Sequence, residues 1–218
     1  MWPPRRPWRS GSCVGVAEPN LSRQAILSNS ITRHHFIRIV IVESIKHTYT
    51  VQWVGPFSSY SDYRAYLNDS HTLGSDCFNI YYFEAQQDAR YKWHRYVGIH
   101  KANDGIEKRL NTSHHHLKKF LSCKKLHIWI GSIADEKQQK PANIDVIETL
   151  LIRAYTDEFL TENSMKTRSN PPCSVCLINM WFDQNETMKT YRIARPFDDV
   201  IIYYHQGNIF KHGNLARF

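Results

Sequence analysis

The chain has 218 residues, of which 28 are Lys or Arg and 20 are Asp or Glu, for a formal net charge of +8. A hydrophobic fraction of 42% and an aromatic fraction of 13% are typical of a folded globular protein with one core, and they exclude a wholly disordered chain. The excess of positive charge favours a polyanionic partner, because Lys and Arg displace the counterions that condense on a phosphate backbone.

Cysteine usage and hydropathy bear on the compartment. The five cysteines are an odd number, and four of them lie at scattered strand or loop positions, which favours a reducing compartment over a disulfide framework. Arg38 interrupts the most apolar run, residues 36–42, so no stretch is long enough to span a membrane. The N-terminus also has no apolar segment of the kind that directs secretion. We therefore expect an intracellular protein, cytoplasmic or associated with the nucleoid or nucleus, with no membrane partner.

Two regions precede the centre of the chain. Residues 1–32 are rich in Pro, Gly, Ser and Arg without periodicity, which predicts a disordered basic tail. Residues 33–77 form the second region. Within it, residues 36–42 are mostly β-branched and residues 49–54 alternate apolar and polar types, which predicts a β-hairpin. The apolar stripe of residues 59–67 then predicts a short helix.

The central region, residues 78–165, combines strands and helices. Strands are expected at residues 78–85 and 93–100, joined as a hairpin, and at residues 125–134. One helix is expected from residue 105 to about residue 121. Pro141 and Asn143 open a second helix, which runs to about Tyr155. This β-β-α-β-α order predicts an α+β fold, with a small mixed sheet flanked by helices.

The last region, residues 166–218, is a β-containing extension of unknown role. A Ser-Asn-Pro-Pro sequence at residues 169–172 marks a break in the chain. Residues 175–182 are apolar, and residues 200–204 are expected to form a strand.

Glu148 lies within an apolar helix stripe. The neighbouring positions of that stripe are Ile144, Ile147, Leu151, Ile152 and Tyr155, at the spacing that faces a core. A carboxylate at such a position is costly unless it is paired, hydrogen-bonded or bound to a metal. The pattern leaves two interpretations open, a functional carboxylate and one half of a buried ion pair.

Arg109 occupies a comparable position in the preceding helix, between Ile106 and Leu110. Its planar guanidinium suits phosphate oxygens, so the position is a candidate phosphate clamp. Two alternatives stay open, in which Arg109 extends along the stripe to solvent or pairs with Glu148.

A basic run extends from Lys101 to Lys125. It holds six lysines, Arg109 and three consecutive histidines, against Asp104 and Glu107. Such a run forms either a solvated helix face or a phosphate-binding face. The candidate contacts with nucleic acid are Lys101, Lys108, Lys118 and Lys119.

The order of several residues resembles the GIY-YIG nuclease family. Members open with a Gly-Ile-Tyr strand and a Tyr-Ile-Gly strand, followed by a helix with Arg and usually His, then a helix with a metal-binding Glu, and then an Asn. The matching residues here are Asn79-Ile80-Tyr81, Tyr96-Val97-Gly98, Arg109, His114 to His116, Glu148 and Asn163. Asn79 replaces the first Gly, and Val97 replaces the central Ile of the second triplet. The resemblance covers residues 79–163 and leaves the flanking regions unmatched.

The resemblance implies a metal-dependent endonuclease that hydrolyses phosphodiester bonds in DNA. Glu148 would bind Mg²⁺ or Mn²⁺, and Arg109 would stabilise charge on the scissile phosphate. Tyr81 would be the candidate general base for the attacking water. The remaining candidates are Tyr96, which would orient water or phosphate, one histidine among His114, His115 and His116, and Asn163, which would hold the site together by hydrogen bonds.

The nuclease interpretation makes a geometric prediction. Tyr81, Tyr96, Arg109 and Glu148 should converge on one open cleft, with Tyr81 and Glu148 on the same face of the sheet. A placement of these two residues on opposite faces would contradict the nuclease interpretation. Two other classes of protein stay open. One is a nuclease-derived module that binds nucleic acid without cleaving it. The other is a structural α+β protein in which Glu148 and Arg109 form a buried pair with no cleft beside them. The substrate, DNA or RNA, and the oligomeric state are not specified by these patterns.

Overall fold

The computed structural model describes residues 44–69, 78–88, 90–101, 106–155, 160, 162–188 and 195–215. The predicted basic tail and the predicted strand at residues 36–42 lie outside these residues. The strands are β1 His47–Phe57, β2 Ile80–Gln86, β3 His94–Ile99, β4 Lys125–Ile133, β5 Val175–Phe182, β6 Val200–Tyr204 and β7 Ile209–Gly213. The helices are α1 Tyr60–Asn68, α2 Ile106–Arg109, α3 His115–Leu121 and α4 Pro141–Tyr155, with a 3₁₀ turn η1 at Glu136–Gln138.

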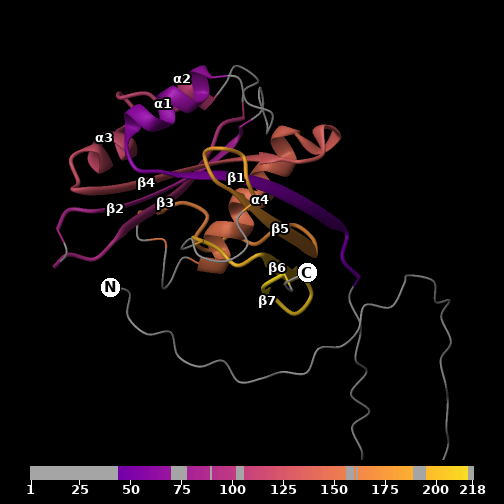
Figure 1. Cartoon of the computed structure of the whole chain (residues 1–218). Coiled ribbons are helices and arrows are strands. Elements are labelled where there is room, and N and C mark those ends of the chain that lie inside the picture. The colour runs from indigo at the N-terminus through magenta and orange to yellow at the C-terminus, as the bar shows by residue number, and fades with distance from the viewer. Residues whose placement is uncertain are drawn as a thin grey trace, which may run out of the picture. The chain divides into compact units, whose positions relative to one another are not determined.

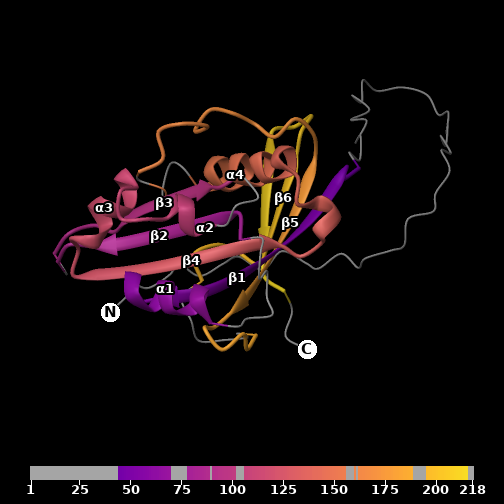
Figure 2. The ribbon, with the colours of Figure 1, turned by 90° about the horizontal axis from the view of Figure 1, so that it is seen from above.

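The described strands form one mixed sheet of seven strands, in the order β3-β2-β4-β1-β5-β6-β7. Strands β1 and β5 run parallel, and every other neighbouring pair is antiparallel. Helices lie on both sides of the sheet (Figure 1, Figure 2), so the predicted α+β class is confirmed. Strand β3 forms one edge of the sheet, and this edge carries the site described below.

Two hydrophobic cores lie on the two faces of the sheet, because successive side chains of a strand point to opposite faces. Helix α4 covers one face, where Ile147 and Leu151 pack with Trp53 and Tyr82. Helices α1, α2 and α3 cover the other face, where Tyr81 belongs to the core. The two adjacent tyrosines of β2 therefore face opposite ways, as the strand pattern predicts.

The helix predicted from residue 105 to residue 121 is wrong, because the described part of this segment forms two short helices. The break falls at Asn111-Thr112-Ser113, where the Ser113 amide donates to Asn111 Oδ1 at 2.9 Å. Side chains of this kind compete for backbone groups and favour turns over helix interiors. His114 then caps α3, because its Nδ1 accepts from the Leu117 amide at 3.2 Å. The break turns His114 inward and leaves it buried.

Strand β1 is a central strand of the described sheet, and the strand predicted to form a hairpin with it, residues 36–42, lies outside the described residues. Residues Val51–Val54 pair with β4 on one edge and with β5 on the other. Pairing with β5 also brings the region after residue 165 into the same sheet as β2, β3 and β4. Strand β7 is an element that the sequence prediction lacks, although the Gly207-Asn208 pair before it is typical of a hairpin turn.

Candidate functional site

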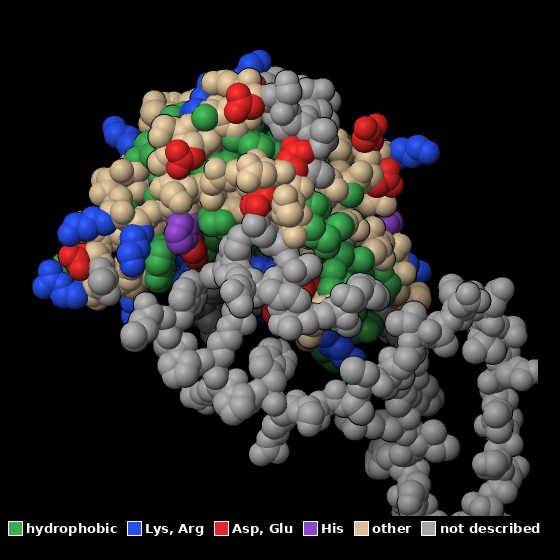
Figure 3. Space-filling view, in the orientation of Figure 1, with side chains coloured by type: hydrophobic (Ala, Val, Ile, Leu, Met, Phe, Trp, Pro, Cys, Tyr) green, Lys and Arg blue, Asp and Glu red, His purple; other side chains and the backbone are tan. Residues whose placement is uncertain are grey.

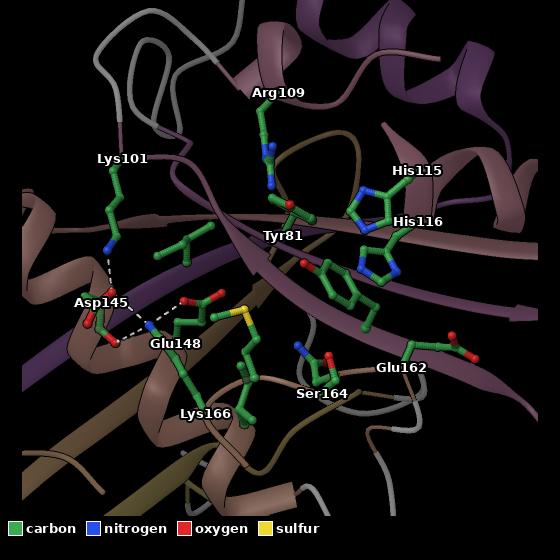
Figure 4. Close-up of a pocket in the computed structure, with 15 residues that line it drawn as sticks. Tyr81, Lys101, Arg109, His115, His116, Asp145, Glu148, Glu162, Ser164 and Lys166 are labelled. Atoms are coloured by element: carbon green, nitrogen blue, oxygen red, sulfur yellow. Dashed lines mark hydrogen bonds and ion pairs between the residues drawn. The ribbon is translucent and has the colours of Figure 1, made fainter. Parts of the chain in front are cut away.

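A pocket of about 420 Å³ lies beside the edge strand β3. Five residues that the family order singled out line it: Tyr81, Tyr96, Arg109, Glu148 and Asn163. They come from β2, β3, α2, α4 and the segment after α4 (Figure 4). The predicted convergence on one cleft is therefore confirmed.

The predicted placement of Tyr81 and Glu148 on one face of the sheet is wrong. Tyr81 packs in the core beneath α1 to α3, whereas α4 covers the opposite face. The two residues still line one pocket, because β3 is the edge strand and nothing beyond it in the described sheet separates the faces. Opposite faces of a sheet are separated only where a further strand lies between them, and beside the edge strand β3 no further strand of the described sheet does so.

Gly98 leaves space for the Tyr81 ring. Tyr81 and Gly98 are direct register partners on β2 and β3. A Cβ atom added at Gly98 would lie 2.4 Å from both Cζ and Oη of Tyr81, far inside van der Waals contact. The glycine of the Tyr-Val-Gly triplet is therefore required for the tyrosine to lie flat across β3 toward the pocket.

His114 holds the hydroxyl of Tyr81, with Nε2 and Oη 3.1 Å apart. Because Nδ1 of His114 accepts from the Leu117 amide, a neutral ring carries its proton on Nε2 and donates it to Tyr81. Burial, followed by the Arg109 charge, lowers the pKa of His114 to about 4, so the ring is neutral near pH 7. His114 does not line the pocket, whereas His115 and His116 do.

The acidity of Tyr81 is set by two opposing effects. Burial raises the pKa of its phenol well above the usual value, and the neighbouring Arg109 charge lowers it by less. The phenol is therefore protonated near pH 7. Its oxygen accepts from His114, and its hydrogen bond with the Tyr96 hydroxyl raises its pKa further.

Arg109 is exposed and lines the pocket. Figure 4 shows its guanidinium directed toward Tyr81. Within the described residues no ion pair joins Arg109 to Glu148; the partner of Glu148 is Lys166. The predicted alternative of a buried Glu148–Arg109 pair without a cleft is therefore wrong.

Glu148 shares an ammonium with Asp145. Lys166 Nζ lies 2.6 Å from Glu148 Oε2 and 2.8 Å from Asp145 Oδ1, and Lys101 binds Asp145 as well (Figure 4). Burial lowers the pKa of Lys166, but its bonds to the two carboxylates outweigh that effect and raise it, so the ammonium stays charged. This pairing offsets the cost of a carboxylate on an apolar stripe. Sequence reasoning missed Lys166, because nothing in the local pattern marks a loop lysine as a partner of α4.

Aromatic rings line the side of the pocket opposite α4. The rings of Tyr96 and His116 stack with centroids 4.0 Å apart, and His115 lies 3.9 Å from His116. Burial and then the charge of His115 lower the pKa of His116. Burial, and after it the charge of Glu148, raises the pKa of Tyr96.

Asn163 ties the segment after α4 to the edge strand, as predicted for it. Its Oδ1 accepts from the Val97 amide at 2.9 Å, and its Nδ2 donates to the Val97 carbonyl at 2.8 Å. The neighbouring Glu162 binds Lys119 at 2.7 Å and His94 at 2.6 Å. This segment therefore closes the pocket on the side of β3.

The four candidate lysines fall into different surroundings. Lys101 lines the pocket, and Lys119 pairs with Glu162 at its rim. Lys108 and Lys118 are exposed and do not line the pocket. Figure 3 shows further Lys and Arg side chains over the tip of the β2–β3 hairpin. The exposed cations of that tip are Arg90, Lys92, Lys124 and Lys125.

The carboxylates of α4 fit a hard divalent cation. The described residues hold no group of three or more His, Cys, Asp or Glu side chains that could bind a metal. Mg²⁺, however, commonly keeps several waters and is held by one or two carboxylates. Asp145 and Glu148 already gather one cation, the Lys166 ammonium, between them. The donor set therefore fits Mg²⁺ or Mn²⁺ on Glu148 once that ammonium moves.

Comparisons with protein-family models, with curated proteins and with solved structures find no match for this chain. None of the described helices is long and apolar enough to cross a membrane. The pocket is therefore the feature of this chain that bears on its function.

Proposed function

We propose that this chain is a GIY-YIG-like endonuclease that hydrolyses phosphodiester bonds in DNA with the help of Mg²⁺ or Mn²⁺. One observation carries the proposal. Tyr81, Tyr96, Arg109, Glu148 and Asn163 occur along the sequence in the order typical of that family. They line a single pocket although they come from five different segments.

Positive charge on the pocket wall suits the phosphate. Arg109 offers a planar fork of N–H donors that matches two phosphate oxygens. Lys101 adds a second charge on the same wall. In the reaction these groups stabilise the negative charge that develops on the phosphate oxygens.

Glu148 would hold the metal, with Asp145 beside it. A metal held by these residues would supply Lewis-acid chemistry at the scissile phosphate. The family implies a single carboxylate ligand, and Glu148 has the position and burial for that role. Asn163 acts as a positioning residue, because it fixes the segment that faces Glu148 across the pocket.

Two side chains can take the proton of the attacking water. Tyr81 is the base that the family implies, and its phenolate would be stabilised by Arg109 and by the proton that His114 donates. Burial works against this role in the substrate-free protein. His116 lines the same pocket and has a lowered pKa, so it is neutral and able to accept a proton near pH 7. A pH–rate profile with Tyr81→Phe and His116→Gln distinguishes the two.

Cleavage of supercoiled plasmid tests the proposed function. Wild-type protein should nick or linearise the plasmid with Mg²⁺ or Mn²⁺ and should be inactive with EDTA. Glu148→Gln keeps the shape of the side chain and should bind DNA but cleave at least about 10³-fold more slowly. Glu136→Gln, at an exposed position of η1, is the matched control and should cleave at the wild-type rate. Metal-independent cleavage, or full activity of Glu148→Gln, would contradict the proposal.

A DNA-binding module without cleavage is the second candidate. The observation that favours it is the Lys166 ammonium on Glu148, since a carboxylate held in this way does not bind a metal. This alternative would be established if the wild-type protein binds DNA with a salt-dependent affinity but does not cleave it at any Mg²⁺ or Mn²⁺ concentration.

A further inference from the structure

Lys166 is held in place by the backbone around it. Earlier in the same segment, before Ser164 and Met165, Asn163 fixes the chain to Val97 of β3. The Lys166 carbonyl accepts from the Ser169 amide at 3.1 Å. Lys166 itself has a φ of 64°, in the left-handed region that non-glycine residues adopt only when their surroundings fix it. The chain therefore presents this lysine to α4 by a defined turn.

The ammonium has a complete set of acceptors on α4. Nζ donates to Glu148 Oε2 at 2.6 Å, to Asp145 Oδ1 at 2.8 Å and to the Asp145 carbonyl at 3.4 Å. A lysine ammonium has three N–H donors, and three acceptors surround this one. Its side chain is 22% exposed, and that of Glu148 is 13% exposed, so the pair is partly shielded from water.

The same carboxylate is the proposed metal ligand. A divalent ion on Glu148 would lie about 2 Å from a carboxylate oxygen, next to an ammonium that binds that carboxylate now. Two like charges so close repel strongly in a partly shielded site. Metal and ammonium are therefore alternative occupants of Glu148.

We propose that Lys166 occupies the cation-binding position of Glu148 and competes there with the divalent metal, so that this lysine sets the metal affinity of the pocket. The inference rests on the proposed role of Glu148 as metal ligand. Figure 4 shows the geometry, with the Lys166 side chain between the two carboxylates.

The chain contains a matched control for this effect. Lys101 also binds Asp145 and also lines the pocket. Its ammonium donates to Asp145 Oδ1, whereas the Lys166 ammonium donates to Glu148 as well. Lys166→Gln and Lys101→Gln remove the same charge from the same pocket, and they differ in whether they free Glu148.

The test is a titration of the full chain with Mn²⁺, without DNA, in which electron paramagnetic resonance measures the free ion. Lys166→Gln should bind Mn²⁺ at least tenfold more tightly than wild type, and Lys101→Gln should change the affinity less than threefold. Lys166→Arg keeps the charge and should stay near wild type. Lys166→Met is a second charge-free variant, in case Lys166→Gln folds poorly. Unchanged or weaker binding by the charge-free variants, or an equal gain in Lys101→Gln, would overturn the inference.

Glu148→Gln separates failure of this inference from failure of the proposed function. If wild type binds Mn²⁺ and Glu148→Gln does not, the metal ligand is established, and unchanged affinity in Lys166→Gln then refutes only the competition. If neither wild type nor Lys166→Gln binds Mn²⁺ through Glu148, the proposed metal site is refuted and the competition with it.

Discussion

Tyr81 and Tyr82 are adjacent tyrosines with different surroundings, and they form a natural pair of test positions. Tyr81 faces the pocket and contacts His114, whereas Tyr82 faces the opposite core and donates to Glu84 at 3.0 Å. Both are fully buried. Removal of the hydroxyl should therefore lower catalysis only at Tyr81 if that residue acts in the reaction. If both hydroxyls act only in stability, their removal should have similar effects.

Tyr81→Phe should lower single-turnover cleavage by about 10²-fold or more, because it removes the hydroxyl that is proposed to take or relay a proton at the pocket wall. Tyr82→Phe should leave the cleavage rate nearly unchanged. It should lower the free energy of unfolding by about 1–3 kcal/mol, because Glu84 loses a buried donor. Plasmid cleavage and urea unfolding of both variants measure these effects. Equal loss of cleavage in the two variants would indicate a purely structural role for Tyr81.

His114 makes the stability of the fold sensitive to acid. Its pKa is about 4 in the folded protein and about 6.5 in an unfolded chain. Between these two pH values the unfolded state binds more protons than the folded state. The contribution of His114 to the free energy of unfolding is therefore complete above about pH 6.5 and is lost as the pH falls to about 4. The loss should reach about 3 kcal/mol at most.

His114→Gln does not titrate, so the stability difference between wild type and this variant should shrink as the pH falls from about 7 to about 4. Urea unfolding at several pH values measures it. His47→Gln, at an exposed position of β1, is the control and should run parallel to wild type. A stability difference between wild type and His114→Gln that stays constant with pH would mean that His114 is not held neutral in the folded protein.

At the scale of single elements, β2 and β3 form the pocket wall through one close approach. Gly98→Ala places a Cβ 2.4 Å from the Tyr81 hydroxyl, so the ring must leave its position across β3. We expect a loss of about 1–3 kcal/mol in stability together with a large loss of cleavage. Gly213→Ala in β7, whose nearest neighbour would lie 3.9 Å away, should change neither. Wild-type cleavage by Gly98→Ala would show that Tyr81 can move without loss of function.

The sequence predicts most elements in the centre of the chain because their patterns are local. A helix and a strand lie where α4 and β6 are predicted, since an apolar stripe or a β-branched run marks each one. A single helix is predicted over residues 105–121 because its apolar spacing continues across Asn111. The side-chain turn that interrupts it is a weaker signal than the stripe.

The members of the candidate site that are predictable from the sequence are those that the order of residues along the chain identifies. Tyr81, Arg109 and Glu148 meet in the pocket as expected. The Lys166 partner of Glu148 and the inward turn of His114 are not predictable. Each depends on how a loop returns to a distant element, and no local periodicity encodes that return.

At the scale of the whole molecule, positive charge extends beyond the pocket onto α3. Lys118→Ala combined with Lys119→Ala should weaken DNA binding regardless of sequence. It should also lower the slope of log K against log salt by about 0.9 for each phosphate that the protein no longer neutralises. Filter binding at several salt concentrations measures the slope, with Lys137→Ala in η1 as a control at an exposed position. An unchanged slope in the double variant would place the DNA on another surface.

The parallel pairing of β1 with β5 has a consequence for the order in which the chain can fold. It aligns Trp53 with Trp181, so the middle of the sheet joins segments made early and late in synthesis. The antiparallel strands β2, β3 and β4 lie closer in sequence and can pair first, which leaves an edge of β4 open until β1 adds to it. Such distant pairing slows folding, and an open edge invites association with other chains. Refolding should therefore show a late phase, which the fluorescence of the stacked Trp53 and Trp181 rings should report in stopped-flow experiments.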